Sequence, residues 1–308
     1  MERHSYTLPG LPDWGRCAVL GILNVTPDSF SDGGRWLDPG RAVAHGLELV
    51  AQGADLVDVG GESTRPGARR VPVEEELARV LPVVRGLARQ GVTVSIDTMR
   101  AEVAEAAVDA GARIVNDVSG GRADDRMAKA VARAGVPFVV MHWRGQSAGM
   151  DGLADYRDVV TEVVAEVGRQ LDAVVSAGVD PAQVIVDPGL GFAKGRGDDL
   201  ALLAALDAWA VLDRPLLVAP SRKRFLGELL ADPATGEPRP AGERDAATAA
   251  AAVLAAAQGA WAVRVHEVRA TADAVRLEAA LRASRSPVGQ GRFRPDPPVG
   301  QSSVRRSR

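Results

Sequence analysis

The 308-residue chain is poor in the residues that form disulfides and structural metal sites. It has one cysteine, Cys17, and four histidines. A single thiol excludes an intramolecular disulfide and fits a reducing compartment. So few cysteines and histidines also argue against a structural zinc site, which takes its ligands from these residue types. We therefore expect Cys17 to have a structural or incidental role.

Long apolar runs are also missing. Residues 1–16 contain no apolar stretch of the kind that forms a secretory signal. The most apolar segment, 246–257, is almost entirely alanine and is shorter than the roughly 20 residues that a membrane-spanning helix needs. We therefore expect a cytoplasmic protein with no membrane partner.

The chain has no excess of positive charge, since 37 basic residues face 40 acidic ones and the net charge is −3. Nucleic-acid-binding proteins normally carry a basic excess, so we expect no nucleic-acid partner. The charge is uneven, because residues 283–308 hold six arginines and one aspartate. Serine, proline, glycine and arginine dominate this end without apolar periodicity, which predicts a disordered basic tail at 284–308.

The sequence does contain a regular alternation of short β-branched runs and longer segments of helical period. The expected strands are Ala18–Asn24, Leu56–Gly60, Thr93–Asp97, Ile114–Asp117, Phe138–His142, Val184–Asp187, Leu216–Ala219 and Ala262–His266. The expected helices lie near 41–52, 74–90, 101–110, 124–134, 157–177, 198–209, 243–257 and 270–283. Six helices are followed by a Gly-Ala or Gly-Val pair, as a left-handed helix stop requires.

Eight strand–helix units without a nucleotide-binding fingerprint favour one architecture. The fold class is α/β, and we predict a single-domain (β/α)8 TIM barrel rather than a doubly wound sheet. We place the barrel at residues 15–283, after an N-terminal extension at 1–14.

Polar residues occur at the carboxyl end of nearly every expected strand. They are Asn24, Asp58, Asp97, Asn116, His142, Asp187, Ser221, Arg264 and His266. Any one of them could be a helix cap or a loop anchor, and Asp58 is expected to be structural because Gly60 and Gly61 form the loop beyond it. Together they indicate a binding site, because this end of a barrel carries the active site.

The residue types at this rim suit two kinds of ligand. Carboxylates and an amide, at Asp97, Asp187 and Asn116, can pair with the N–H groups of a flat heterocycle such as a pterin or guanine ring. Arginine, threonine and histidine side chains beside Asn24 could hold a diphosphate with Mg²⁺. In this arginine-rich chain, a surface ion pair is the alternative role for each arginine.

Seven segments resemble, in the same order, the signatures of the dihydropteroate synthase family. They are Asn24–Gly34, Asp58–Gly67, Ser95–Thr98, Asn116–Gly121, Val186–Phe192, Ser221–Lys223 and Arg264–His266, within a match over about residues 15–282. The resemblance implies a barrel transferase of folate biosynthesis that uses Mg²⁺, is a homodimer and is a target of sulfonamides. Its reaction would condense 6-hydroxymethyl-7,8-dihydropterin diphosphate with 4-aminobenzoate to give 7,8-dihydropteroate and diphosphate.

The resemblance also implies a role for individual residues. The pterin would be bound by Asp97, Asn116, Asp187, Lys223, Met141 and Arg264. The diphosphate would be bound by Thr64, Arg65, Arg264 and His266, with the metal on Asn24. The aminobenzoate pocket would be formed by Phe30, Pro66, Phe192 and Arg224. The residues expected to act in catalysis are Arg65, Lys223, Arg264, His266 and Asp32.

Two positions depart from the family pattern, which usually reads Gly-x-Ser-Arg-Lys-Ser. Here Ala219 replaces the glycine, and Arg224 replaces a hydroxyl that commonly contacts the aminobenzoate carboxylate. The change leaves open a synthase-inactive, pterin-binding paralogue with a regulatory or partner role. A methyltransferase barrel that uses a methylated folate is a weaker alternative, because it has no need of the Asn24–Gly34 and Asp58–Gly67 loops.

Overall fold

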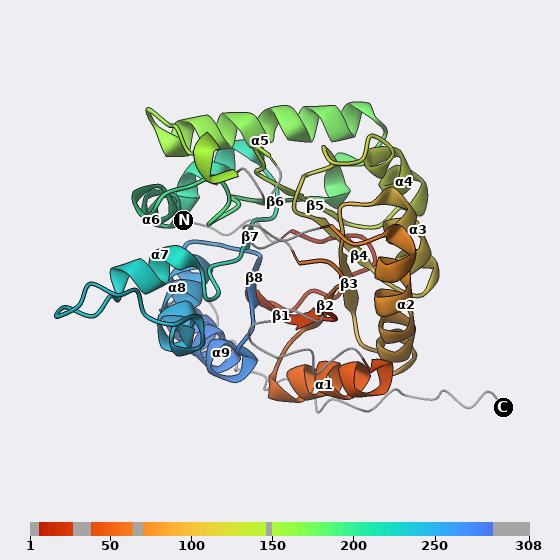
Figure 1. Ribbon diagram of the computed structural model, residues 1–308, viewed down its shortest axis with the longest axis horizontal. Coiled ribbons are helices and arrows are strands. Elements are labelled where there is room, and N and C mark those ends of the chain that lie inside the picture. The colour runs from red at the N-terminus through yellow and green to blue at the C-terminus, as the bar shows by residue number, and fades with distance from the viewer. Residues whose placement is uncertain (1–5, 27–37, 64–69, 146–149, 286–308) are drawn as a thin grey trace.

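The computed structural model describes residues 6–26, 38–63, 70–145 and 150–285. Its strands form a parallel sheet in the order β6-β5-β4-β3-β2-β1-β8-β7. An isolated parallel bridge between Val186 and Leu216 brings β6 beside the start of β7, and the sheet closes there. Figure 1 shows the strands at the centre with the helices around them. The predicted TIM barrel is therefore confirmed.

The elements have the following bounds. The strands are β1 (Ala18–Asn24), β2 (Leu56–Gly60), β3 (Val94–Asp97), β4 (Ile114–Asp117), β5 (Phe138–Met141), β6 (Val184–Asp187), β7 (Leu217–Val218) and β8 (Ala262–Val265). The helices are α1 (Pro39–Gln52), α2 (Val73–Arg89), α3 (Ala101–Asp109), α4 (Met127–Ala134), α5 (Val159–Ser176), α6 (Arg196–Ala204), α7 (Arg224–Leu229), α8 (Asp245–Ala257) and α9 (Val268–Arg285).

The predicted strands agree with the observed ones to within one residue at each end, but one helical prediction is wrong and one helix was missed. The helix expected at 198–209 ends at Ala204, and a separate 3₁₀ helix, Leu206–Leu212, follows it. The short helix α7 was not predicted. The six glycines expected to stop helices all have positive φ: Gly53, Gly91, Gly111, Gly135, Gly178 and Gly259.

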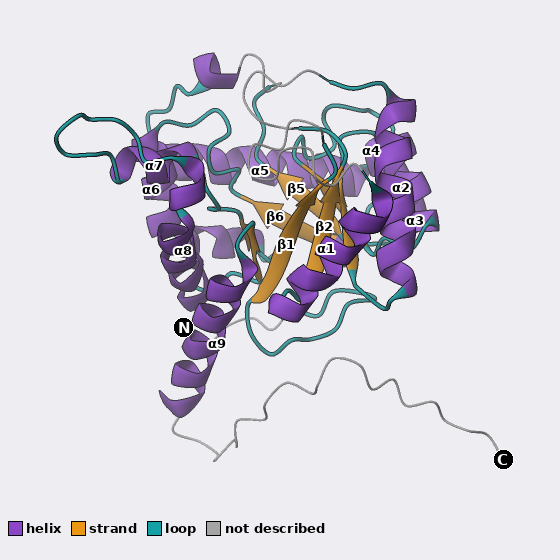
Figure 2. Ribbon diagram, turned by 60° about the horizontal axis from the view of Figure 1, so that its bottom comes forward, coloured by secondary structure: helices purple, strands orange, loops and turns teal. Residues whose placement is uncertain are grey.

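Two apolar layers follow from the two-residue period of the strands. One face of each strand points into the barrel, where Leu20, Leu56, Val139, Ile185 and Leu217 form an interior layer. The opposite face packs against the helices through a larger cluster that includes Val57, Val115, Val140, Val186 and Val263. Figure 2 shows the helices enclosing the strands.

The amino-terminal residues close one end of the barrel. Leu8 is buried against the interior layer, and Leu11 and Trp14 pack beside it with Trp261. The ring centroids of Trp14 and Trp261 lie 6.2 Å apart. Ligand access is therefore left to the opposite end, at the carboxyl ends of the strands. No helix in the described ranges is both long enough and apolar enough to cross a membrane.

Candidate active site

The polar side chains of the site continue the inward faces of the strands. Asp58, Asn116, Asp187 and Arg264 come two residues after Leu56, Ile114, Ile185 and Ala262, which all belong to the interior layer. Because strand side chains alternate between faces, these polar groups form the next layer above an apolar floor. A charged layer inside a barrel is costly unless its members pair with one another or with a ligand.

Arg264 connects the strands at the centre of this layer. Its Nε donates to Oδ2 of Asp58 over 2.6 Å, and its Nη2 donates to Oδ2 of Asp97 over 2.6 Å. The Nδ2 of Asn116 donates to the same Asp58 oxygen over 3.0 Å. Strands β2, β3, β4 and β8 thus contribute to one hydrogen-bonded cluster.

Asp58 does more than the sequence suggested. It was expected to anchor the loop at Gly60 and Gly61, but it is fully buried and holds both Arg264 and Asn116. Its Oδ1 has no hydrogen-bond partner among the described residues. The signal that could have revealed this role is its place two residues after Leu56, on the inward face of β2.

Burial shifts the pKa values of the charged groups here toward neutrality. It raises the pKa of Asp97 to about 7, against the opposing effect of Arg264. Burial also raises the pKa of Asp187, although the backbone N–H of Gly189 and the amine of Lys223 act to lower it. It lowers the pKa of Lys223 to about 8, although Asp187 and Asp199 favour the charged form. Buried groups of both signs with such shifts are typical of functional sites.

An apolar wall adjoins the charged cluster. Met141, at the end of β5, is buried with Met99 and Val118, and Phe192 packs against this group. The Nζ of Lys223 lies 4.3 Å from the centroid of the Phe192 ring, in position for a cation–π contact. A flat ring held by the carboxylates could therefore be covered by apolar side chains, and the structure brings Met141, Phe192 and Lys223 together as expected.

His266 pairs with Ser221 across the ends of β8 and β7. The Oγ of Ser221 lies 2.9 Å from Nδ1 of His266 and accepts from its backbone N–H over 3.1 Å. If the hydroxyl donates to Nδ1, the proton of a neutral imidazole lies on Nε2. A histidine at this place suits an anionic ligand, because an imidazole N–H can donate to it.

Asn24 ends β1 next to Gly60, which ends β2. A Cβ atom on Gly60 would lie 3.7 Å from both Oδ1 of Asn24 and Oδ2 of Asp97. These two oxygens therefore border one small space that the glycine keeps open. No cluster of three or more His, Cys, Asp or Glu side chains suited to a metal exists in the part of the chain that the structure describes. Mg²⁺ commonly takes one or two protein oxygens and completes its shell with water and phosphate, and Asn24 fits that pattern.

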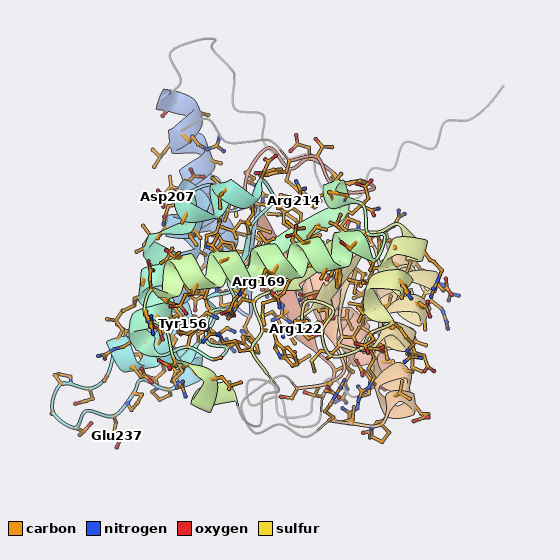
Figure 3. All side chains as sticks on the ribbon, turned by 90° about the horizontal axis from the view of Figure 1, so that it is seen from above. Arg122, Tyr156, Arg169, Asp207, Arg214 and Glu237 are labelled. Atoms are coloured by element: carbon orange, nitrogen blue, oxygen red, sulfur yellow. The ribbon has the colours of Figure 1, made fainter. Side chains whose placement is uncertain are left out.

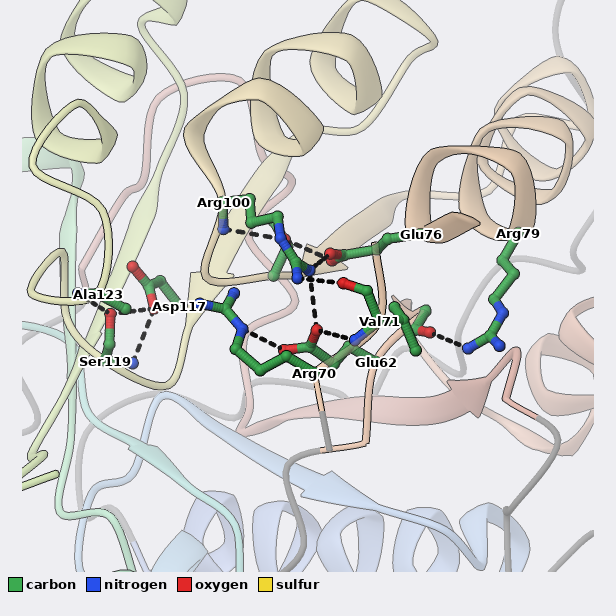
Figure 4. Close-up of polar contacts among 11 residues, drawn as sticks. Glu62, Arg70, Val71, Glu76, Arg79, Arg100, Asp117, Ser119 and Ala123 are labelled. Carbon is green, nitrogen blue, oxygen red and sulfur yellow. Dashed lines mark hydrogen bonds and ion pairs between the residues drawn. The ribbon is translucent and has the colours of Figure 1, made fainter. Parts of the chain in front are cut away.

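A charged network lies at both ends of the second loop of the site, the loop that follows β2 and includes residues 64–69. The carboxylate of Glu62 accepts from Nε of Arg70 over 3.1 Å, from the backbone N–H of Val71 over 3.0 Å, and from Arg100 over 2.8 Å. Arg100 also pairs with Glu76 of α2. Figure 4 shows this network beside the end of β2. One buried carboxylate thus joins the residues on both sides of 64–69.

Arg224 begins α7, directly after Lys223. Its side chain is half exposed, with Nη2 3.5 Å from the backbone oxygen of Lys194 and Nε 3.6 Å from Glu228. The preceding Arg222 has a positive φ of 57° and binds Asp245 of α8 through two hydrogen bonds. The pairing of Arg222 fixes the start of α7 and presents Arg224 next to the loop that carries Phe192.

His142 does not belong to the rim, contrary to the sequence prediction. It lies two residues after Val140, on the same face of the strand, and that face packs against the helices. Its ring contacts Glu166 of α5 instead of the charged cluster. Its neighbour Met141 faces inward. The prediction assigned His142 to the rim because it follows a strand, without counting the alternation of faces.

Five residues assigned by the resemblance lie outside the described residues. They are Phe30, Asp32, Thr64, Arg65 and Pro66. Their assignments stay predictions.

Comparison with known proteins identifies the family of this site. A model of the pterin binding enzyme family matches residues 20–266. The chain therefore belongs to the pterin-binding enzymes. It is 58% identical over 260 residues to the dihydropteroate synthase of Mycobacterium leprae, covering 84% of this chain and 91% of that protein. The chain is thus a member of the dihydropteroate synthases, which are transferases of folate synthesis.

Solved structures give the same result. Dihydropteroate synthase of Yersinia pestis, in a sulfonamide complex, superposes with a TM-score of 0.84 at 39% identity, covering 90% of this chain and 98% of that one. The enzyme of Xanthomonas albilineans with 4-aminobenzoic acid gives a TM-score of 0.79 at 46% identity, over 87% and 94% of the two chains. The same enzyme with 7,8-dihydropteroate gives 0.76 at 43% identity, over the same shares.

Proposed function

We propose that this chain joins 6-hydroxymethyl-7,8-dihydropterin diphosphate to 4-aminobenzoate, releasing diphosphate and 7,8-dihydropteroate. The proposal rests on one observation: polar side chains gather at the carboxyl end of the barrel, and Arg264 among them is held by two carboxylates. The other members of this group are Asp97, Asn116, Asp187 and Lys223. These groups match the donors and acceptors of a pterin ring. The relatives solved with 4-aminobenzoic acid and 7,8-dihydropteroate support the choice of substrates.

The pterin is held by the charged layer. The carboxylate of Asp187 keeps one oxygen on the backbone N–H of Gly189, over 2.7 Å, and offers the other to ring N–H groups. Asn116 supplies an amide, and Lys223 donates to a ring oxygen or nitrogen. Met141 and Phe192 cover the ring, so that water is excluded from one side of it.

The diphosphate lies on the side of Asn24, Arg264 and His266, with Thr64 and Arg65 added from the second loop. Mg²⁺ on Asn24 supplies charge neutralisation for the leaving diphosphate when it is bound. Arg264 and the Nε2 of His266 stabilise the negative charge that develops on the leaving oxygen, and Arg65 adds to this effect. Such stabilisation is usually the largest contribution to a rate enhancement.

The aminobenzoate amine attacks the methylene group of the pterin as the diphosphate leaves. The attacking aryl amine is uncharged, so no strong general base is required. Asp97 and Asp187 favour the cationic character that the ring gains in the transition state. The pocket that orients the amine is assigned to Phe30, Pro66 and Phe192, and the carboxylate at the far end of the substrate is assigned to Arg224. Correct placement contributes much of the remaining acceleration. Asp32 of the first loop and Lys223 complete the catalytic set.

We further propose a cytoplasmic homodimer. The chain has a single cysteine, Cys17, and therefore no intramolecular disulfide, which fits a reducing compartment. Helices α8 and α9 pack against each other and leave Leu254, Leu277 and Leu281 exposed, which supports a partner surface on this side. Light scattering after size-exclusion chromatography would give twice the chain mass if the proposal is right.

A diphosphate-release assay tests the function. The purified chain is incubated with the pterin diphosphate, 4-aminobenzoate and Mg²⁺, and release is compared with reactions that lack one component. Release only in the complete mixture is the expected result, and a sulfonamide should reduce it by competing with 4-aminobenzoate. Tight pterin binding without turnover would instead favour the inactive paralogue.

A further inference from the structure

A buried lysine lies behind the site, and the proposed mechanism does not use it. Lys194 follows β6 and is 1% exposed. Its Nζ lies 2.9 Å from Nδ1 of His142 and donates to the backbone oxygen of Phe192 over 2.9 Å. Burying an amine is costly unless it forms hydrogen bonds, and Nζ of Lys194 has two such partners, His142 and the backbone oxygen of Phe192.

His142 extends this contact to the outer helices. Its Nε2 lies 2.9 Å from Oε2 of Glu166 on α5, and Arg144 donates to both oxygens of Glu166. A carboxylate only accepts, so Nε2 carries the proton and Nδ1 is free to accept from Lys194. Burial, together with the charge of Lys194, lowers the pKa of His142 to about 3, so the ring is neutral. Every bond in the chain from Lys194 to Glu166 therefore has a donor and an acceptor.

The loop that Lys194 belongs to is fastened at several further points. The backbone N–H of Gly191 donates to Asp199 over 2.6 Å, and the hydroxyl of Tyr156 donates to the backbone oxygen of Ala193 over 3.0 Å. Ala193 has a positive φ of 50°, a conformation that is unfavourable for a residue with a side chain. Tyr156, labelled in Figure 3, stacks under the guanidinium of Arg144, 3.9 Å from the ring centroid. A strained loop is thus held in one conformation by side chains from outside it.

Both described residues that are assigned to the aminobenzoate pocket touch this loop. Phe192 is part of it, and its backbone oxygen accepts from Lys194. The Nη2 of Arg224 lies 3.5 Å from the backbone oxygen of Lys194. Most residues assigned to the pterin, namely Asp97, Asn116, Asp187, Met141 and Arg264, are instead strand residues, fixed by the sheet. Only Lys223 among them meets this loop, at the ring of Phe192. A substitution of Lys194 should therefore weaken the binding of 4-aminobenzoate more than the binding of the pterin.

We propose that Lys194, held by His142 and Glu166, is a positioning residue that sets the aminobenzoate side of the site without touching either substrate. The proposal rests on the proposed function. The hydrogen bonds that link Lys194, His142 and Glu166 keep the ring of Phe192 against Lys223. They also fix the backbone carbonyl of Lys194, which Arg224 approaches.

The first experiment compares Lys194→Met with Lys129→Met in steady-state kinetics. Lys129 is an exposed lysine of α4, so its variant applies the same chemical change away from the loop. We expect Lys194→Met to raise the KM for 4-aminobenzoate about tenfold and to lower pterin affinity by a clearly smaller factor, through Phe192 and Lys223, while Lys129→Met matches the wild type. An unchanged KM, or an equal loss of pterin affinity, overturns the proposal.

The second experiment needs no turnover. Hydrogen exchange of the 188–195 backbone should become faster in Lys194→Met, with no change in the β1 and β2 peptides. If the wild type does not turn over, the proposed function fails, whereas this measurement still decides whether Lys194 holds the loop. Unchanged exchange in 188–195 contradicts the proposal even in an active enzyme.

A milder variant covers the case in which Lys194→Met does not fold. Glu166→Gln keeps the shape of the side chain and weakens the outer end of the chain, so a smaller but equally selective rise in the aminobenzoate KM is expected. In a double-mutant cycle, Glu166→Gln should add little to Lys194→Met, because the two residues act through the same histidine. Fully additive effects would mean that the residues act separately, which overturns the connected chain.

Discussion

The Nε of Arg264 donates to Oδ2 of Asp58 over 2.6 Å, joining the eighth strand to the second across 206 residues of sequence. Asp58 has no expected contact with substrate, yet it fixes the arginine that is assigned to both pterin and diphosphate. The charged layer therefore behaves as one unit, in which a change at a supporting carboxylate alters ligand binding.

Substitution of Asp58 tests this connection. Asp58→Asn removes one of the two charges that hold Arg264, and a hydrogen bond to a charged group contributes about 1.5–3 kcal/mol. We expect the Kd for the pterin diphosphate to rise at least about tenfold in calorimetry. Asp55→Asn is the matched control, because Asp55 pairs with Arg16 through bonds of 2.7 and 2.9 Å before β2 begins. Equal losses of pterin affinity in the two variants would contradict the connection.

Asp187→Asn tests the carboxylate assigned to the ring itself. The amide oxygen can still accept from Gly189, so the loop is kept, while the charge that pairs with ring N–H groups is lost. Pterin binding should weaken by about 1–3 kcal/mol, the usual cost of unpairing a buried charged hydrogen bond. Asp117→Asn is the control, since the buried Asp117 bonds to Ser119 and Gly121 on the outer face of β4. Undiminished affinity in Asp187→Asn would remove this residue from the pterin site.

Arg224→Ala tests the departure from the family pattern. If Arg224 binds the carboxylate of 4-aminobenzoate, the variant should raise its KM about tenfold and leave the KM for the neutral 4-aminobenzamide unchanged. Glu228→Gln serves as a control, because it removes the acidic partner that lies 3.6 Å from Arg224 and leaves the arginine in place. A similar rise for both substrates would show that Arg224 shapes the pocket without reading the charge.

Asn24→Ala tests the metal ligand. The variant should need a higher Mg²⁺ concentration for half-maximal diphosphate release, and chelation by EDTA should abolish turnover in the wild type. Asn24→Asp keeps an oxygen in the same place and should retain a low half-maximal concentration. A Mg²⁺ dependence that is identical in all three proteins would exclude Asn24 as a ligand.

His142 predicts a specific dependence of stability on pH. Its pKa is lowered from 6.5 to about 3 by burial and by Lys194, so the unfolded chain binds the extra proton between these values. The stability that neutral His142 contributes is complete above pH 6.5 and is lost as the pH falls toward 3, by at most about 1.4 kcal/mol per pH unit. The difference in unfolding free energy between the wild type and His142→Gln should therefore shrink between pH 6 and 4. A constant difference would contradict a neutral buried imidazole.

Local patterns were sufficient to predict the barrel, because strand period, glycine stops and short turns act within a few residues of one another. The polar residues at the strand ends could be assigned to one rim for the same reason. The roles of Asp58 and His142 were not predicted, because a position near the end of a strand does not say which face the side chain presents, and that face follows only from counting the alternation along the strand. Helix α7 was missed because six residues are too few to show a helical period.

The closing of the barrel also has a consequence for the order of its elements in the chain. Strands β6 and β7 meet through the bridge from Val186 to Leu216, whereas β1 and β2 share five paired positions. The loops that carry Phe192 and Lys223 follow the two strands of this junction. A circular permutant with new ends at the turn near Asp213 and Arg214 would cut the chain at the junction with the fewest backbone bonds. It should fold to the same barrel, and its aminobenzoate pocket would then be built from opposite ends of the polypeptide.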